Sequence, residues 1–442
     1  MARAASWLST GATARKGLVS IVDQAFLSGT TFVTSILLAK FCTEQEFGSY
    51  VVAFGVYVFL HRTQTSLVSN PLTVLGSSKS KVEFGKYVSS LFLLQTLLCL
   101  IGVAVTGGTA AMVLTALEAP VIGSALLGLT AAVPFLETRE FIRRVLFVRL
   151  EPGRVLMNDV LYGAAVLAML FLLKRSDALH AWAVFLGIGA VSALCCVVGL
   201  WQIRLHLGNP SGRLRSTLDE QWRFGRWLLV ETVASYAFME VPILLVGVWV
   251  GASGAARLGA SRYVLAPLQV ALFGIANVAG PKAAAVYHQQ GRESLNRFLW
   301  RVSFASVGIF AVYCLAAAMV PEWPLRLLYG NKYAGELLHV RLWAAIYMLM
   351  ALRQITTLGL SAMRRPDIIV TASIAPAVLA VLACAATMGV WQDIGALAAR
   401  LGAELLCFVI ACALLVRGNV ERSPVVDLRD ESIPLDNVES DT

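Results

Sequence analysis

Long apolar runs recur along almost the whole chain, and they constrain its fold more than any other feature of the sequence. A helix needs about 20 mostly apolar residues to cross a hydrocarbon core of about 30 Å. Runs of this kind lie at residues 17–41, 47–75, 87–106, 117–136, 155–173, 180–200, 227–250, 258–279, 298–319, 337–358, 368–388 and 394–416. Only 14% of the residues are charged, against about 25% in soluble domains. The sequence therefore predicts an all-α polytopic membrane protein with about twelve transmembrane helices.

Lysine and arginine are concentrated in alternate connections between these runs, which indicates the orientation because short cytoplasmic loops carry the basic excess. The basic connections contain Lys79, Lys81 and Lys86; Arg139, Arg143, Arg144, Arg149 and Arg154; Arg204, Arg213, Arg215, Arg223 and Arg226; Lys282, Arg292 and Arg297; and Arg364 and Arg365. Both termini are then expected in the cytoplasm. The net charge of +9 is explained by this topology and indicates no nucleic-acid partner.

A duplication is suggested by the spacing of residues in the two halves. Gly17 precedes Asp23 by six residues, as Gly225 precedes Glu231. We expect two parallel six-helix lobes, 1–203 and 226–416, related by an axis along the membrane normal and enclosing a V-shaped central cleft. A basic cytoplasmic linker at 204–225 would join them, and the acidic segment 417–442 is too polar to bury a core and is expected to be disordered.

Charged residues inside the first two runs are the informative exceptions. Asp23 lies early in the first run, and His61 and Arg62 lie in the inner half of the second. An ionisable side chain near the membrane centre costs about 2.5 to 3.5 kcal/mol, so it usually faces a bundle interior or a watery cavity. A polar path across the membrane is one interpretation. The alternative is that Arg62 reaches toward the interface and Asp23 is neutral or paired.

The second half carries further charges within its runs: Glu231, Glu240, Arg262, Arg353, Arg400 and Glu404. Arg400 and Glu404 are four residues apart, so they share a helix face and form a possible structural pair. Arg62 and Arg353 are predicted to converge near the inner leaflet as an anion site, because arginine presents a planar fork to phosphate oxygens. Pairing with Asp23 or Glu231 is the competing account. Arg262 either reaches the outer interface or lines the cavity.

Transport is the function that these features favour. Asp23, Glu231 and Glu240 are the candidate proton or sodium carriers, since burial can bring a carboxylate close to neutrality. Pro242 removes a helix hydrogen bond beside Glu240 and predicts a bend in the seventh run. The sequence contains no phosphate-loop, zinc-protease or serine-hydrolase motif and no cysteine and histidine set at metal spacing. We therefore expect neither an enzyme nor a cofactor.

A family resemblance is found in three segments of the chain. The opening GLVSIVDQAFLSGTTFVTSILLAKFCTEQEFGSYVVAF, with its polar pair and E-F-G turn, resembles the first-helix pattern of bacterial polysaccharide and O-antigen flippases. LGASRYVLAPLQVALFGIANVAGPKAA and LLYGNKYAG are similar to later parts of that family. The family lies in the multidrug/oligosaccharidyl-lipid/polysaccharide exporter superfamily, whose members are V-shaped pairs of six-helix lobes.

The resemblance implies a transporter that flips an undecaprenyl-diphosphate-linked oligosaccharide to the outer leaflet of the bacterial plasma membrane, for a surface polymer such as lipopolysaccharide. Arg62, Arg353 and Arg262, with His61 beside Arg62, would bind the substrate, and a polymerase and glycosyltransferases are the expected partners besides membrane lipids. One alternative is a cation-coupled exporter of drugs or metabolites that uses Asp23, Glu231 and Glu240 as ligands. Another is a non-transporting scaffold of a polysaccharide-synthesis complex.

Overall fold

The computed structural model describes residues 2–208, 214–363 and 366–417, and these consist of helices joined by short connections. The helices are α1 (Ala2–Phe41), α2 (Glu44–Gln64), α3 (Asn70–Gly76), α4 (Lys81–Thr115), α5 (Pro120–Val148), α6 (Pro152–Arg175), α7 (Ala181–Ile203), α8 (Leu214–Met239), α9 (Val241–Trp249), α10 (Ala252–Val264), α11 (Ala266–Met319), α12 (Glu322–Tyr329), α13 (Leu337–Ala362) and α14 (Pro366–Arg417). A π-helical turn, Thr65–Ser69, joins α2 to α3, and a short 3-10 helix, Arg204–His206, follows α7. These ranges contain no strand, and the all-α prediction is confirmed.

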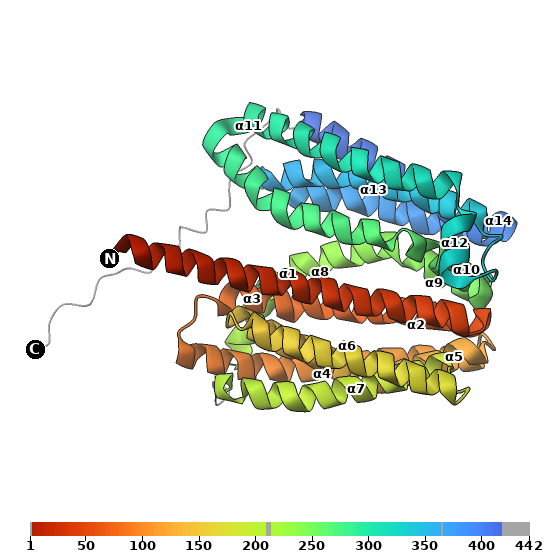
Figure 1. Ribbon diagram of the computed structural model, residues 1–442, viewed down its shortest axis with the longest axis horizontal. Helices are drawn as coiled ribbons and strands as arrows, with labels where there is room; N and C mark the ends of the chain where they lie inside the picture. Colours follow the sequence, from red (N-terminus) through yellow and green to blue (C-terminus); the bar gives the residue numbers. More distant parts are fainter. Residues whose placement is uncertain (1, 209–213, 364–365, 418–442) are drawn as a thin grey trace, which may run out of the picture.

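Two of the helices are too long to cross a membrane only once. Within the described ranges, seven helices are long and apolar enough to span, or eight if the bent pair α8 and α9 counts as one span. Among them α11 has 54 residues and α14 has at least 40 in its apolar part. At 1.5 Å per residue, α11 would be about 80 Å long, more than twice the thickness of the hydrocarbon core. It folds back where Gly291 leaves helical geometry, and Gln392 interrupts α14 in the same way (Figure 1).

The polytopic membrane fold is therefore confirmed, whereas the number twelve and the division into lobes at 203 and 226 stay predictions. The segments 209–213 and 418–442, parts of the predicted linker and tail, lie outside the described residues. The bend predicted at Pro242 is confirmed, because α8 and α9 meet at an angle of 46°. Arg139 and Arg143 are a correction: we expected them in a cytoplasmic connection, but α5 continues to Val148 and buries both side chains.

Helix α1 and helix α2 run through the middle of the molecule. Figure 1 shows α4 to α7 on one side of them and α11, α13 and α14 on the other, with α8, α9 and α10 between. The largest core cluster includes Phe47 of α2, Phe185 of α7 and Tyr347 of α13. The apolar interior is thus continuous across this central layer.

Helix α2 packs against α8, α9 and α10 along its length. Near its start, Gly48 lies so close to α10 that a Cβ atom would stand 1.7 Å from the Ala252 carbonyl oxygen, so no larger residue fits without displacing backbone. In the middle, the Tyr236 hydroxyl donates to the Gly55 carbonyl oxygen at 2.8 Å. At the other end, the Ser66 and Thr232 hydroxyls are hydrogen-bonded at 2.7 Å. These contacts join the first half of the chain to the second.

The π-helical turn Thr65–Ser69 has a local cause in the sequence. Pro71 follows it within a continuous helical path, and proline cannot donate a backbone hydrogen bond to the carbonyl four residues earlier. Widening the preceding turn accommodates that loss, and π-turns of this kind are frequent at functional sites. The turn faces α8, where Gly225 permits close approach: a Cβ there would lie 2.9 Å from the Ser66 carbonyl oxygen.

The C-terminus of α1 is capped by Lys332, a lysine from the connection between α12 and α13. The Lys332 amine donates to the carbonyl oxygens of Ala39, at 2.8 Å, and of Cys42. A cation at this position satisfies carbonyls that the last helical turn leaves without partners. Burial lowers the pKa of the Lys332 amine, while Glu44 and Cys42 act in the opposite direction.

Candidate functional site

Five charged side chains from α1, α5 and α6 form a dense set, which we call the N-terminal charge network: Asp23, Arg139, Glu140, Arg143 and Asp159. Arg143 donates to three carboxylates: to Asp23 Oδ2 at 2.9 Å, to Asp159 Oδ2 at 2.7 Å and to Glu140 Oε2 at 2.9 Å. Arg139 donates to Asp159 Oδ1 at 2.9 Å and to Glu140 Oε1 at 3.4 Å. Its guanidinium also lies 3.7 Å from the centre of the Tyr162 ring.

Burial makes this network a structural unit. Asp23 and Asp159 are fully buried, and Arg139 and Arg143 are more than nine-tenths buried. Charges removed from water are stable only when they are paired and hydrogen-bonded, which the two guanidinium groups achieve here. The sequence interpretation named Asp23 alone among these residues as a candidate site residue, and it placed Arg139 and Arg143 in a basic connection. The one signal for the others was the spacing of Arg139 and Arg143, which places both on one helix face.

A second group, the C-terminal charge set, contains Glu240, Arg262, Arg353, Arg400 and Glu404. Arg262 makes two hydrogen bonds with Glu240, both of 3.0 Å. Arg353 Nε donates to Glu404 Oε1 at 2.6 Å. Arg400 Nη2 lies 3.8 Å from Glu404 Oε2, too far for a hydrogen bond, and Arg400 Nη1 instead donates to the Phe238 carbonyl oxygen at 2.7 Å. The set is less tightly paired than the N-terminal charge network.

Arg62 belongs to neither of these two groups and lies on the face of α2 that meets α8. Its Nη1 donates to the hydroxyl of Ser235 at 3.3 Å. In the described part of the chain it has no carboxylate within 4.0 Å, and its side chain is only half-buried. Glu231 is exposed on α8, and the charges that act on its carboxylate are those of Arg62 and Arg353. A guanidinium with donors to spare can bind an anion.

The structure gives several of the predicted site residues partners other than those that the sequence suggested. Asp23 is bound to Arg143 and has no ion pair with Arg62 or Arg353. Arg353 is bound to Glu404, on the helix that also carries Arg400. His61, predicted to bind substrate, has Nδ1 3.9 Å from Glu137 Oε1, a residue that the sequence interpretation did not single out. The functional roles of all these residues stay predictions.

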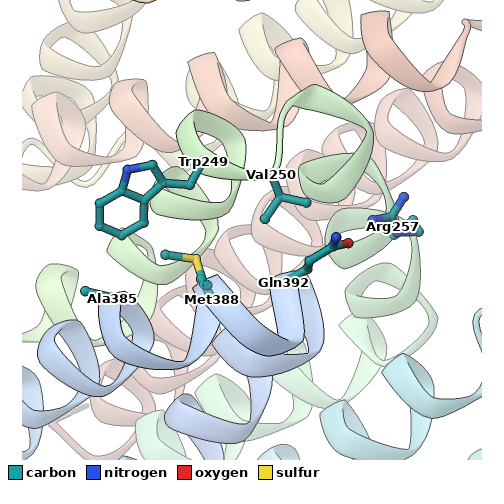
Figure 2. A pocket seen from close by; sticks show the side chains of 7 residues that line it. Trp249, Val250, Arg257, Ala385, Met388 and Gln392 are labelled. Atoms are coloured by element: carbon teal, nitrogen blue, oxygen red, sulfur yellow. The ribbon is translucent and has the colours of Figure 1, made fainter.

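A cavity of about 660 Å3 lies between α9, α10 and α14, and Figure 2 shows its lining. Trp249 and Met388 form an apolar wall, whereas Arg257 and Gln392 lie on its polar side (Figure 2). Arg257 Nε donates to Asp393 Oδ2 at 2.6 Å, so its charge is already balanced. The predicted binding and coupling residues are not among those that line this cavity.

Comparison with protein families decides the classification. The model of a family described as polysaccharide biosynthesis protein matches residues 37–336, well over half of the chain. The chain belongs to this family. No curated protein matches it significantly. The matched segment of this chain, 37–336, contains four of the charged residues discussed above: Arg62, Glu231, Glu240 and Arg262. Four others lie outside the matched segment: Asp23, Arg353, Arg400 and Glu404.

Solved structures of transporters share the fold of this polysaccharide biosynthesis protein. The lipid II flippase MurJ in an inward closed conformation is 12% identical, with a TM-score of 0.72 over 90% of this chain and 87% of MurJ. An inward-facing multidrug resistance MATE family transporter of the MOP superfamily is also 12% identical, with a TM-score of 0.72 over 90% of this chain and 98% of the transporter. An outward-facing MATE transporter gives 0.62 at 10% identity over 92% and 95%. At these identities the likeness shows the fold alone, and that fold is shared by a flippase and drug transporters.

Proposed function

We propose that this protein flips an undecaprenyl-diphosphate-linked oligosaccharide from the cytoplasmic to the outer leaflet of the bacterial inner membrane. The family match to polysaccharide biosynthesis proteins and the fold shared with a lipid II flippase support a lipid-linked glycan as cargo. In this proposal the lobes 1–203 and 226–416 rock against each other, both termini are cytoplasmic, and the lipid tail remains in the bilayer.

The observation that carries the proposal is the arginine pair around the α2–α8 contact. Arg62 has no carboxylate within 4.0 Å in the described part of the chain and retains donors beyond its bond to Ser235. Arg353 uses Nε on Glu404, which leaves its two Nη groups for another acceptor. A diphosphate offers several anionic oxygens, and arginine forks bind such oxygens in pairs. Arg262 and His61 complete the proposed binding set.

Alternating access requires the α2–α8 contact to open. At one end of the contact, such an opening breaks the hydrogen bond between Ser66 and Thr232 and the close approach at Gly225. Further along α2 it also breaks the Arg62–Ser235 and Tyr236–Gly55 hydrogen bonds. A single neutral hydrogen bond contributes only about 1 kcal/mol, so this end of the interface is cheap to separate. The cargo's diphosphate would then reach Arg62 from the side that opens.

The test uses cells that lack the gene. We expect them to accumulate a lipid-linked glycan on the cytoplasmic side and to lose the corresponding surface polymer. Complementation with Arg62→Ala or Arg353→Ala should fail at normal protein levels. Arg154→Ala is the matched control, because it removes an exposed arginine on α6 whose ion pair, among the described residues, is with neighbouring Glu151. Normal polymer export with both arginine variants would contradict the proposed site.

A cation-coupled exporter is the second candidate, favoured by the exposed Glu231 carboxylate and by the likeness to MATE transporters. Asp23, Glu231 and Glu240 would then be the coupling or substrate ligands. In that case Glu231→Gln and Asp23→Asn should abolish resistance to cationic compounds, and deletion of the gene should leave the glycans unchanged. A scaffold that transports nothing should tolerate these substitutions and both arginine variants.

A further inference from the structure

Glu137 is a buried carboxyl group for which the functional proposal has no use. It lies on α5 with 3% of its surface exposed. Both of its carboxylate oxygens are buried, and neither has a hydrogen-bond partner among the described residues. Its neighbour Glu140, one turn further along α5, accepts hydrogen bonds from both Arg139 and Arg143. One helix thus carries a fully paired carboxylate and an unpaired one.

His61 approaches Glu137 from α2. Its Nδ1 atom lies 3.9 Å from Glu137 Oε1, beyond hydrogen-bond distance, and is itself buried without a partner. The His61 side chain as a whole is 35% exposed, so part of it reaches the protein surface. The ring stacks on Tyr57, with the ring centroids 5.8 Å apart. The imidazole therefore connects an accessible surface with a buried acid.

An ionised carboxylate without donors is strongly disfavoured in an apolar interior, and burial of the protonated form costs far less. We propose that Glu137 and His61 form a proton-binding site in which the imidazole carries protons between its accessible face and the Glu137 carboxyl group. A proton from water binds Nε2 of the ring. As the two side chains close to hydrogen-bond distance, Nδ1 gives up its proton to Glu137 Oε1. The imidazolium and carboxylate become a neutral imidazole and a neutral carboxylic acid.

The ionisable groups around this site come from four helices. On α5 they are Glu140, Arg139, Arg143 and Arg144; on α2, α4 and α6 they are Tyr57, Cys99 and Tyr162. Glu140 and two of the arginines are already bound within the N-terminal charge network, and the tyrosines and the cysteine are neutral at physiological pH. Arginine remains charged there as well. Among the described residues of this cluster, Glu137 and His61 are consequently the ionisable pair whose facing atoms, Glu137 Oε1 and His61 Nδ1, are buried without a hydrogen-bond partner.

The position of His61 suggests what the proton does. The carbonyl oxygens of His61 and Arg62 both accept from the Thr65 N–H, where α2 changes into the π-helical turn. That turn contacts α8, so a change in the charge of His61 acts directly on the segment that joins the two halves. This coupling role rests on the proposed transport function, whereas proton binding by Glu137 does not.

Infrared difference spectroscopy on the purified full-length protein in lipid vesicles tests the site. We expect a band of a protonated carboxylic acid at neutral pH that shifts in D2O and disappears in Glu137→Gln. Glu137→Leu, which replaces the acid with an apolar side chain of similar size, should remove the same band. Glu151→Gln, at a partly exposed glutamate outside this cluster, is the control and should keep it. A band that persists in both Glu137 variants would overturn the proton site.

His61→Phe separates the relay from the acceptor, because phenylalanine retains the stacking on Tyr57 but carries no proton. The band should remain and its exchange in D2O should slow on the order of 100-fold. Unchanged exchange would overturn the relay. In a flipping assay, the pH dependence should be lost in Glu137→Gln; loss of the band with unchanged pH dependence would overturn the coupling. The infrared result is the same whatever the cargo, so it distinguishes failure of this site from failure of the proposed function.

Discussion

The two charged groups of the molecule have similar compositions but different degrees of pairing. The N-terminal charge network combines two arginines with three carboxylates, and the C-terminal charge set combines three arginines with two. In the former, Arg143 alone satisfies three carboxylates. In the latter, Arg400 is beyond hydrogen-bond distance of Glu404 and donates instead to the backbone carbonyl oxygen of Phe238. The N-terminal charge network ties α1, α5 and α6 together, whereas Arg353 of the C-terminal charge set and Arg62 are the arginines for which we propose an anionic ligand.

The largest effect should come from removing the centre of the N-terminal charge network. Arg143→Ala leaves Asp23, Asp159 and Glu140 buried without their shared donor. Breaking a buried pair on one side costs about 3 to 5 kcal/mol, and we expect a loss of that size in the free energy of unfolding in detergent micelles. A loss below about 1 kcal/mol would show that the network is not structural.

The C-terminal charge set should respond less to a change that keeps the charge. Arg262→Lys retains the cation opposite Glu240 but loses the fork that makes two hydrogen bonds of 3.0 Å. Hydrogen bonds to charged groups contribute about 1.5 to 3 kcal/mol, and one of the two is lost. Denaturant titration of the purified protein measures the change. An effect as large as that of Arg143→Ala would remove the contrast between the two groups.

The contact between α2 and α8 should be weaker than either charged group. Ser66→Ala removes the hydroxyl that is bonded to Thr232 at 2.7 Å, at an expected cost of about 1 kcal/mol. Thr232→Val should cost about the same, and the double variant should cost less than the two single changes added together, because both remove one interaction. Strict additivity in this double-mutant cycle would mean that the two hydroxyls do not interact.

The smallest effect is expected for the exposed pair of Arg154 and Glu151. Its atoms are 2.6 Å apart, but the arginine side chain is 49% exposed. Exposed pairs contribute between about 0 and 1 kcal/mol, so Arg154→Ala should leave the unfolding midpoint almost unchanged. This variant sets the baseline against which the buried arginines are compared.

The sequence was sufficient for those features that depend on composition along the chain. Apolar length predicted the membrane helices, Pro242 predicted the bend between α8 and α9, and three local segments predicted the family. Partners were not predictable in the same way. The competing account paired Asp23 with Arg62 or Arg353, but its partner, Arg143, is 120 residues away and had been assigned to a loop. A single sequence does not indicate at what depth a charged residue lies in the membrane or which neighbouring helix its side chain faces, so the pairing of two such residues cannot be predicted from it.

Glu137 was missed for a related reason. The fourth apolar run ends at residue 136, so a glutamate at the next position was counted with the polar connection. In the structure α5 continues for twelve further residues to Val148, and this position is interior. Hydropathy shows where a helix becomes polar. When the polar side chains bind one another, as they do in α5, the helix remains in the packed interior beyond that point.

The π-helical turn gives α2 one residue of slack. If Thr65–Ser69 returned to α-helical hydrogen bonding, the segment beyond it would rotate by about 100° and advance by about 1.5 Å relative to the segment before it. Ser66 would turn away from Thr232 while nearly every backbone hydrogen bond of the helix was kept. The segment after the turn thus has two possible registers relative to α8. A shift of one residue at this point changes which face of the helix meets α8, and the helix does not need to unfold.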